Sequence, residues 1–119
     1  MAAQGYVKLW RSDEFWQLVK DHKAYVLASI IAVRARRTDG LNLYSLDVGD
    51  ALLGDYRDYG MTEGEYREAK KRLQDAKYAT FRTTNRGTIA RLVFTGVFDP
   101  NLETEQRAAQ QTNNEPRND

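Results

Sequence analysis

The chain has 119 residues, of which 41% are hydrophobic and 11% aromatic, enough for one packed domain and too many for a disordered chain. There is no cysteine, which excludes a disulfide scaffold, a thiol nucleophile and a thiolate metal site. The formal net charge is only +1, so the overall charge by itself does not indicate a nucleic-acid partner.

The first third of the chain predicts an extended arm and two helices. Residues 5–10 are expected to form a short strand or arm, anchored by their apolar side chains: Tyr6, Val7, Leu9 and Trp10. Ser12 followed by two acids is typical of a helix N-cap and predicts a short helix over residues 14–21. A longer helix, from about Lys23 to Arg36, is apolar on most sides and is expected at the centre of the core.

That apolar helix does not predict a membrane span. Its longest apolar run, Ala24 to Val33, is about half the length needed to cross a bilayer. The N-terminus also lacks the basic and apolar segments of a secretory signal. We therefore expect a cytoplasmic protein without a membrane partner.

The middle of the chain predicts a loop, a short strand and a further helix. Asp39-Gly40 is a strong turn signal, and residues 41–46 have the alternation of a short strand. Leu52, Leu53 and Tyr56 share one helical face and predict a helix over residues 49–58. Gly60 then permits the left-handed conformation that ends a helix.

A second helix of this pair is predicted over residues 63–76. Thr62 and Glu65 fit the capping-box pattern at its start. The apolar positions expected on its buried face are Tyr66, Ala69, Leu73 and Ala76. A helix, a tight turn with glycine and a second helix together make a helix-turn-helix outline.

Residues 78–94 predict a β-hairpin whose tip is Thr84-Asn85-Arg86-Gly87. The turn needs a positive φ at one or two positions, which Asn85 and Gly87 can adopt at low cost, and we expect Arg86 between them to point into solvent. An ordinary hairpin, with Asn and Gly for the turn and Arg for solubility, is the alternative. The hairpin would close a domain at residues 1–98, followed by a polar, disordered tail at residues 99–119.

Positive charge is concentrated in the helix pair and the hairpin. Residues 61–91 hold eight Lys and Arg against four Asp and Glu, whereas residues 92–119 hold two against five. A phosphate senses such local charge within a Debye length of about 8–10 Å. The pattern predicts an α+β winged helix-turn-helix, a helical core with a C-terminal β-hairpin wing, that binds double-stranded DNA sequence-specifically.

The predicted DNA contacts divide between base edges and the phosphate backbone. Arginine can bond guanine bidentately and glutamate can accept from cytosine, so the start of the second helix is assigned to base edges. Hydroxyl, amide and guanidinium groups suit phosphates, so the hairpin is assigned to the backbone. The base-edge residues are Thr62, Glu63, Arg67 and Lys71, and the backbone residues are Lys70, Arg82, Thr84, Asn85 and Arg86.

The helix also has a simpler interpretation. Glu63 and Arg67, and likewise Glu68 with Lys71 or Arg72, are spaced as ion pairs on a solvated face. No motif for catalysis competes with DNA binding: the sequence has one histidine, no P-loop, no dinucleotide-binding glycine motif and no carboxylate cluster at metal-ligand spacing. We therefore expect no enzyme, no cofactor and no metal site.

Three segments carry a resemblance to a known family: GYVKLWR at residues 5–11, GDALLGDYRDYGMTEGEYREAKKRL at residues 49–73 and ATFRTTNRGTIARL at residues 79–92. They resemble the DnaD-like replisome-organiser and replication-initiation domains of phages and prophages. The resemblance implies duplex DNA binding at replication origins or promoters, often as a homodimer or larger assembly with other replication proteins.

The chain departs from that family in two ways. After the hairpin the given sequence continues as a polar tail, and we expect no helicase-loading module. It also places Gly64 at the start of the second helix, where glycine costs about 1 kcal/mol relative to alanine. Two other functions remain open: a transcriptional regulator on the same fold, and a winged-helix protein-interaction module that docks a partner through Tyr59, Tyr66 or the long helix.

Overall fold

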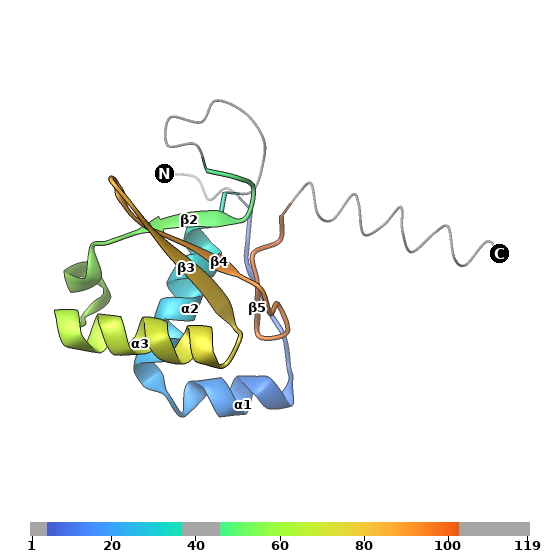
Figure 1. Cartoon of the computed structure of the whole chain (residues 1–119). Helices are drawn as coiled ribbons and strands as arrows, with labels where there is room; N and C mark the ends of the chain where they lie inside the picture. The colour runs from blue at the N-terminus through green and yellow to red at the C-terminus, as the bar shows by residue number, and fades with distance from the viewer. Residues whose placement is uncertain (1–4, 37–45, 103–119) are drawn as a thin grey trace.

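The computed structural model describes residues 5–36 and 46–102 (Figure 1). In chain order its elements are β1 Lys8–Leu9, α1 Asp13–Val19, α2 His22–Arg34, β2 Asp50–Leu53, the 3-10 helix η1 Tyr56–Tyr59, α3 Glu63–Asp75, β3 Ala79–Thr84, β4 Gly87–Leu92 and β5 Phe98–Asp99. The predicted α+β class is confirmed. The predictions for residues 37–45 and 103–119 lie outside the described residues.

Two antiparallel sheets organise the strands. The larger sheet has the order β2-β4-β3, so the central strand β4 pairs with β2 on one side and with its hairpin partner β3 on the other. The smaller sheet pairs β1 with β5, with Leu9 opposite Phe98. Segments from the two ends of the described chain therefore lie side by side, as Figure 1 shows.

The core forms between α2, α3 and the larger sheet. Helix α2 lies at its centre, as predicted, with Leu27 and Ile31 fully buried. Helix α3 contributes Tyr66, Ala69 and Leu73, also as predicted. Ala76 is exposed, contrary to the prediction, because α3 ends at Asp75 and Ala76 is only its C-cap.

The predicted helix over residues 49–58 is wrong, because β2 and η1 occupy this segment. Leu52 and Leu53 are too short an apolar run to distinguish a helix from a strand. Pairing with β4, more than 30 residues away, decides the outcome, with Leu52 opposite Ile89. Gly54 then separates β2 from η1 with a φ of +146°, which a helix excludes.

Three of the helix ends lie at predicted capping residues. The Ser12 hydroxyl accepts a hydrogen bond from the Phe15 amide at the start of α1. Thr62 and Glu65 form a complete capping box at the start of α3. Gly60, at φ +73°, ends η1 in the left-handed conformation. These local interactions turn the chain sharply from η1 into α3.

Both ends of the predicted domain differ from expectation. Tyr6, Leu9 and Trp10, expected as anchors of the arm, are exposed, while Val7 is half-buried. The folded unit also continues beyond residue 98, since Asp99 pairs in β5 and Leu102 is buried.

None of the helices among the described residues has the length and apolar character to cross a membrane.

A buried carboxylate ties the three strands of the larger sheet together. Asp50, at the start of β2, is only 4% exposed. Its Oδ1 accepts from Arg91 Nε of β4 at 3.0 Å and its Oδ2 accepts from Arg82 of β3 at 3.2 Å. The Asp47 backbone amide donates a third hydrogen bond to the same carboxylate. Such a charge is stable inside a protein only while its partners hold it.

Asp50→Ala should lower the free energy of unfolding by about 2–4 kcal/mol, because it leaves two arginines without their shared acid and an amide without its acceptor. Asp47→Asn is the matched control, since the Asp47 side chain is exposed and its backbone amide is retained; it should change stability by less than about 0.5 kcal/mol. Urea unfolding followed by circular dichroism measures both. Equal stability of the two variants would contradict the structural role of Asp50.

Candidate nucleic-acid interface

The start of α3 and the β3–β4 hairpin form the candidate interface. In Figure 1 the hairpin projects beyond the body of the domain, toward the same side as η1 and the start of α3. Thr62 lies at the first turn, but its hydroxyl accepts from the Glu65 amide and its own amide donates to the Glu65 carboxylate. The structure thus uses Thr62 to begin the helix.

The exposed face of α3 begins with an ion pair. Arg67 donates to the Glu63 carboxylate at 3.1 Å, and both side chains are about two-thirds exposed. Lys71, one turn further along the same face, is also exposed. This confirms the Glu63–Arg67 pair that a solvated face predicts, and it places the three predicted base-edge side chains Glu63, Arg67 and Lys71 in one row.

Lys70 lies beside this row and is half-buried. Its ammonium is 4.5 Å from the centroid of the Tyr66 ring. Burial lowers the pKa of Lys70, and the positive charge of Arg67 lowers it further. An anion close to Lys70 would relieve this repulsion, which suits the backbone contact that the sequence predicts.

Acids from other elements neutralise part of the cationic segment. Arg72 pairs with Asp21 at 2.5 Å, and Arg82 pairs with Asp50 at 3.2 Å. Asp21 and Asp50 lie outside residues 61–91, so the local charge excess in the sequence overstates the positive charge on the surface. Arg82 nevertheless keeps 57% of its side chain exposed.

The hairpin tip is built by hydroxyl hydrogen bonds and a glycine. The Thr84 hydroxyl accepts from the Arg86 amide and donates to the Gly87 carbonyl, so Thr84 shapes the turn. Gly87 has a φ of +129°, and a Cβ there would lie 2.6 Å from the Leu53 carbonyl oxygen. Of the two candidates for a positive φ, Gly87 adopts it and Asn85 does not, since Lys77 and Asn101 are the non-glycine residues with positive φ among those described. Asn85 and Arg86 are exposed at the tip.

The sequence did not predict a cluster of polar and aromatic side chains that holds η1, the segment that leads into α3. Arg34, at the end of α2, donates to both oxygens of Asp55 at 2.7 and 2.8 Å. The Tyr59 hydroxyl also donates to Asp55, and the Arg34 guanidinium lies 5.4 Å from the Tyr59 ring. Tyr56 stacks on Tyr66 at 5.6 Å, which joins η1 to α3. The spacing of Arg34 and Asp55, 21 residues apart, carries no local signal.

The contacts of this cluster shift the pKa values of Asp55 and Tyr59 in opposite directions. The hydrogen bonds from Arg34 and then from Tyr59 hold the pKa of Asp55 far below its ordinary value of 3.8. Burial, followed by the hydrogen bond to Asp55, raises the pKa of Tyr59 above its ordinary value of 10.0. The carboxylate is therefore ionised and the phenol protonated at neutral pH, as the bidentate contact requires.

The candidate site has no feature of a metal centre. Within residues 5–36 and 46–102, the structure contains no group of three or more His, Cys, Asp or Glu side chains placed to share an ion. Comparison with models of known protein families, with curated proteins and with solved structures finds no match to this chain. The geometry of the described residues is therefore the basis for assigning a function.

Asp55→Asn should reduce the loss of thermal stability that accompanies acidification. Because the folded-state pKa of Asp55 lies below 3.8, this group stabilises the fold above that value, and its contribution is lost as the pH falls toward the folded-state pKa. Thermal unfolding between about pH 6 and about pH 2 should show a smaller fall in Tm for the variant than for the parent chain. The exposed Asp58→Asn is the control. Parallel profiles for parent and Asp55→Asn would contradict the assignment.

Proposed function

We propose that the described domain is a winged helix-turn-helix that binds double-stranded DNA, with α3 in the major groove and the β3–β4 hairpin along the neighbouring backbone. The observation that carries this proposal is the order α2, β2, η1, α3, β3, β4 combined with the sheet order β2-β4-β3. This arrangement leaves one face of α3 exposed and sets a projecting hairpin next to it, as a groove-binding helix with a flanking wing requires.

The row on α3 has the chemistry to read a base step. The exposed Glu63–Arg67 pair is worth only about 0.3–0.5 kcal/mol, so it opens at little cost. Arg67 can then donate to guanine O6 and N7, and Glu63 can accept from the amino group of a cytosine. Gly64 adds no side chain beside Glu63, where a Cβ would have only the Thr62 hydroxyl oxygen within contact distance, at 4.0 Å, so the helix start can approach the groove floor.

The hairpin supplies the backbone contacts. Asn85 and Arg86 are exposed at its tip, where both side chains can donate to phosphate oxygens. At its base, one Asp50 carboxylate lies between Arg82 and Arg91, so this trio keeps a net positive charge while the acid fixes the guanidinium positions. A preorganised cation loses less side-chain entropy on binding phosphate than a free one.

We propose replication initiation of the phage or prophage type as the biological role, on the resemblance of residues 5–11, 49–73 and 79–92 to DnaD-like domains. Transcriptional regulation on the same fold would use the same surface. Footprinting on the genome that encodes the chain separates the two: protection at a replication origin supports the initiator, and protection confined to promoters supports the regulator.

The double variant Arg67→Ala/Arg86→Ala should weaken duplex binding by about 10–100-fold, because it removes one base-edge donor and one phosphate contact. Its Tm should stay within about 3 °C of the parent chain, since both side chains are exposed. Lys20→Ala, an exposed cation at the end of α1, is the control and should bind normally. Fluorescence anisotropy with a labelled duplex measures the affinity. Unchanged affinity, or a variant that no longer folds, would overturn the site.

The single variants should separate specificity from affinity. Arg67→Ala should reduce the ratio of specific to random duplex binding, because the lost contact reads a base. Arg86→Ala should weaken both duplexes alike and lower the slope of log affinity against log salt by about 0.9, because the lost contact neutralises a phosphate. Competition anisotropy over a salt series measures both quantities. The opposite assignment of the two effects would show that α3 and the hairpin exchange roles.

A further inference from the structure

Residues 63–71 of α3 expose only charged side chains. The Thr62 hydroxyl is used in the capping box, and the exposed helix residues that follow it are Glu63, Gly64, Glu65, Arg67, Glu68 and Lys71. The apolar side chains of this segment, Tyr66 and Ala69, are buried in the core. The part of α3 proposed to enter the major groove therefore offers a base no amide and no apolar side chain.

Charged side chains differ from amides in the hydrogen bonds that they can make to a base. Arginine and lysine carry only donors, and an ionised carboxylate carries only acceptors. In the major groove guanine presents only acceptors, N7 and O6, and cytosine presents only a donor, its N4 amino group. Adenine presents a donor beside an acceptor, which suits an amide, and thymine presents an acceptor beside a methyl group, which suits an apolar side chain. The row Glu63, Arg67 and Lys71 therefore matches G·C pairs better than A·T pairs.

The Glu63–Arg67 ion pair sets the spacing between two such contacts. Arg67 Nη2 lies 3.1 Å from Glu63 Oε2, and the two side chains are 69% and 65% exposed. Successive bases of a strand in duplex DNA are about 3.4 Å apart. The donor end of Arg67 and the acceptor end of Glu63 are therefore spaced to reach neighbouring base pairs without a large movement of either side chain.

We propose that α3 reads two neighbouring G·C pairs, with Arg67 bonded to the guanine of one pair and Glu63 to the cytosine of the next. The inference rests on the duplex binding proposed above and adds the base composition of its target. Thymine opposite Glu63 would place two acceptors against each other, and adenine opposite Arg67 would offer one acceptor in place of two. An A·T pair at either position therefore leaves a polar group of the interface without its partner, which weakens the complex.

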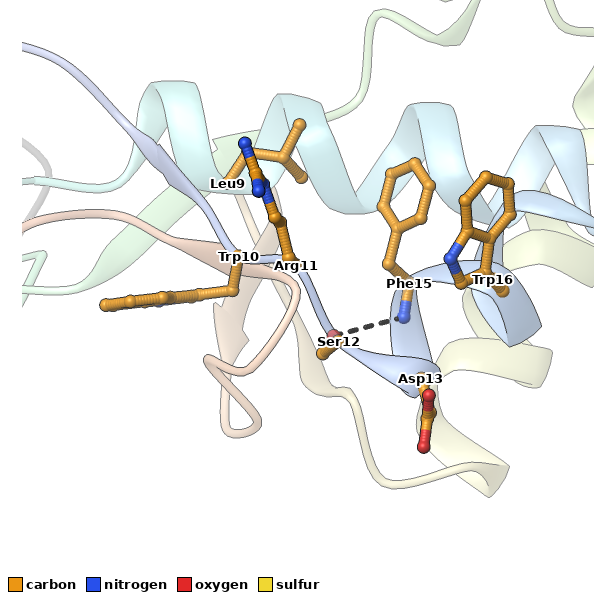
Figure 2. Close-up of a pocket in the computed structure, with 7 residues that line it drawn as sticks. All are labelled: Leu9, Trp10, Arg11, Ser12, Asp13, Phe15 and Trp16. Carbon is orange, nitrogen blue, oxygen red and sulfur yellow. Dashed lines mark hydrogen bonds between the residues drawn. The ribbon is translucent and has the colours of Figure 1, made fainter.

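A second exposed surface provides a control for this specificity. Figure 2 shows a groove between the N-terminal arm and α1, with a volume of about 610 Å³, in which the rings of Trp10 and Trp16 lie on either side of Ser12. Trp10 is 48% exposed and Trp16 is 64% exposed. Indole rings can stack on any base, because every base has a π face. Contact between DNA and this groove would therefore add affinity without a preference for G·C pairs.

Selection from a pool of duplexes with randomised sequence tests the inference on the full chain. The parent chain should enrich duplexes with two neighbouring G·C pairs, as sequencing of the bound pool measures. Glu63→Gln should change the preferred base at one position from cytosine to adenine and retain the neighbouring guanine, because an amide carries a donor beside an acceptor. Glu68→Gln, the same change outside the row, and Trp16→Ala are the controls and should retain the preference of the parent chain.

A chemical change in the selected duplex provides a second measurement. 7-Deazaguanine lacks the N7 acceptor, so its use in place of the selected guanine should weaken binding of the parent chain at least about fivefold, whereas Arg67→Ala should bind both duplexes alike.

Two results would overturn the inference and leave duplex binding intact: a bound pool without a G·C preference at neighbouring positions, or a parent chain that binds the 7-deazaguanine duplex as tightly as the unmodified one. Retention of no duplex from the pool would overturn the proposed function and this inference together.

Discussion

The position of the β3–β4 hairpin in the larger sheet depends on the ion pairs of the buried Asp50 carboxylate. The carboxylate, on the first residue of β2, forms ion pairs with Arg82 of β3 and Arg91 of β4. These ion pairs therefore connect all three strands of the β2-β4-β3 sheet. A carboxylate that is 4% exposed is stable only while both guanidiniums remain in place. The same contact therefore fixes the start of the hairpin and sets the position from which Arg82 faces solvent.

Two clusters of polar and aromatic side chains position the two parts of the candidate interface. Asp50 holds the hairpin, whereas Arg34, Asp55 and Tyr59 hold η1 against the end of α2 and, through Tyr56 on Tyr66, hold α3. Apolar packing of α2 against α3 alone would allow the helix to rotate or slide. Directional hydrogen bonds remove that freedom, as the base contacts proposed for α3 would require.

Capping residues in the sequence predicted the helix ends that short-range hydrogen bonds determine. Ser12, Gly60 and the Thr62–Glu65 box locate helix ends because capping acts within four residues. The sequence does not reveal β2, whose two leucines fit either a helix or a strand until β4 pairs with them. Nor does it show that Asp50 reaches Arg82 from 32 residues away, which is why a count of charges along residues 61–91 exaggerated the cationic surface.

The central claim is that the start of α3 and the hairpin tip together meet a DNA duplex. Backbone amide chemical shifts of the labelled chain, followed during titration with a short duplex, test it most directly. The account expects the largest shifts at Glu63, Arg67, Lys71, Asn85 and Arg86, with Trp10 and Trp16 unaffected. Shifts concentrated on α1 and the N-terminal arm, with α3 and the hairpin unchanged, would contradict it.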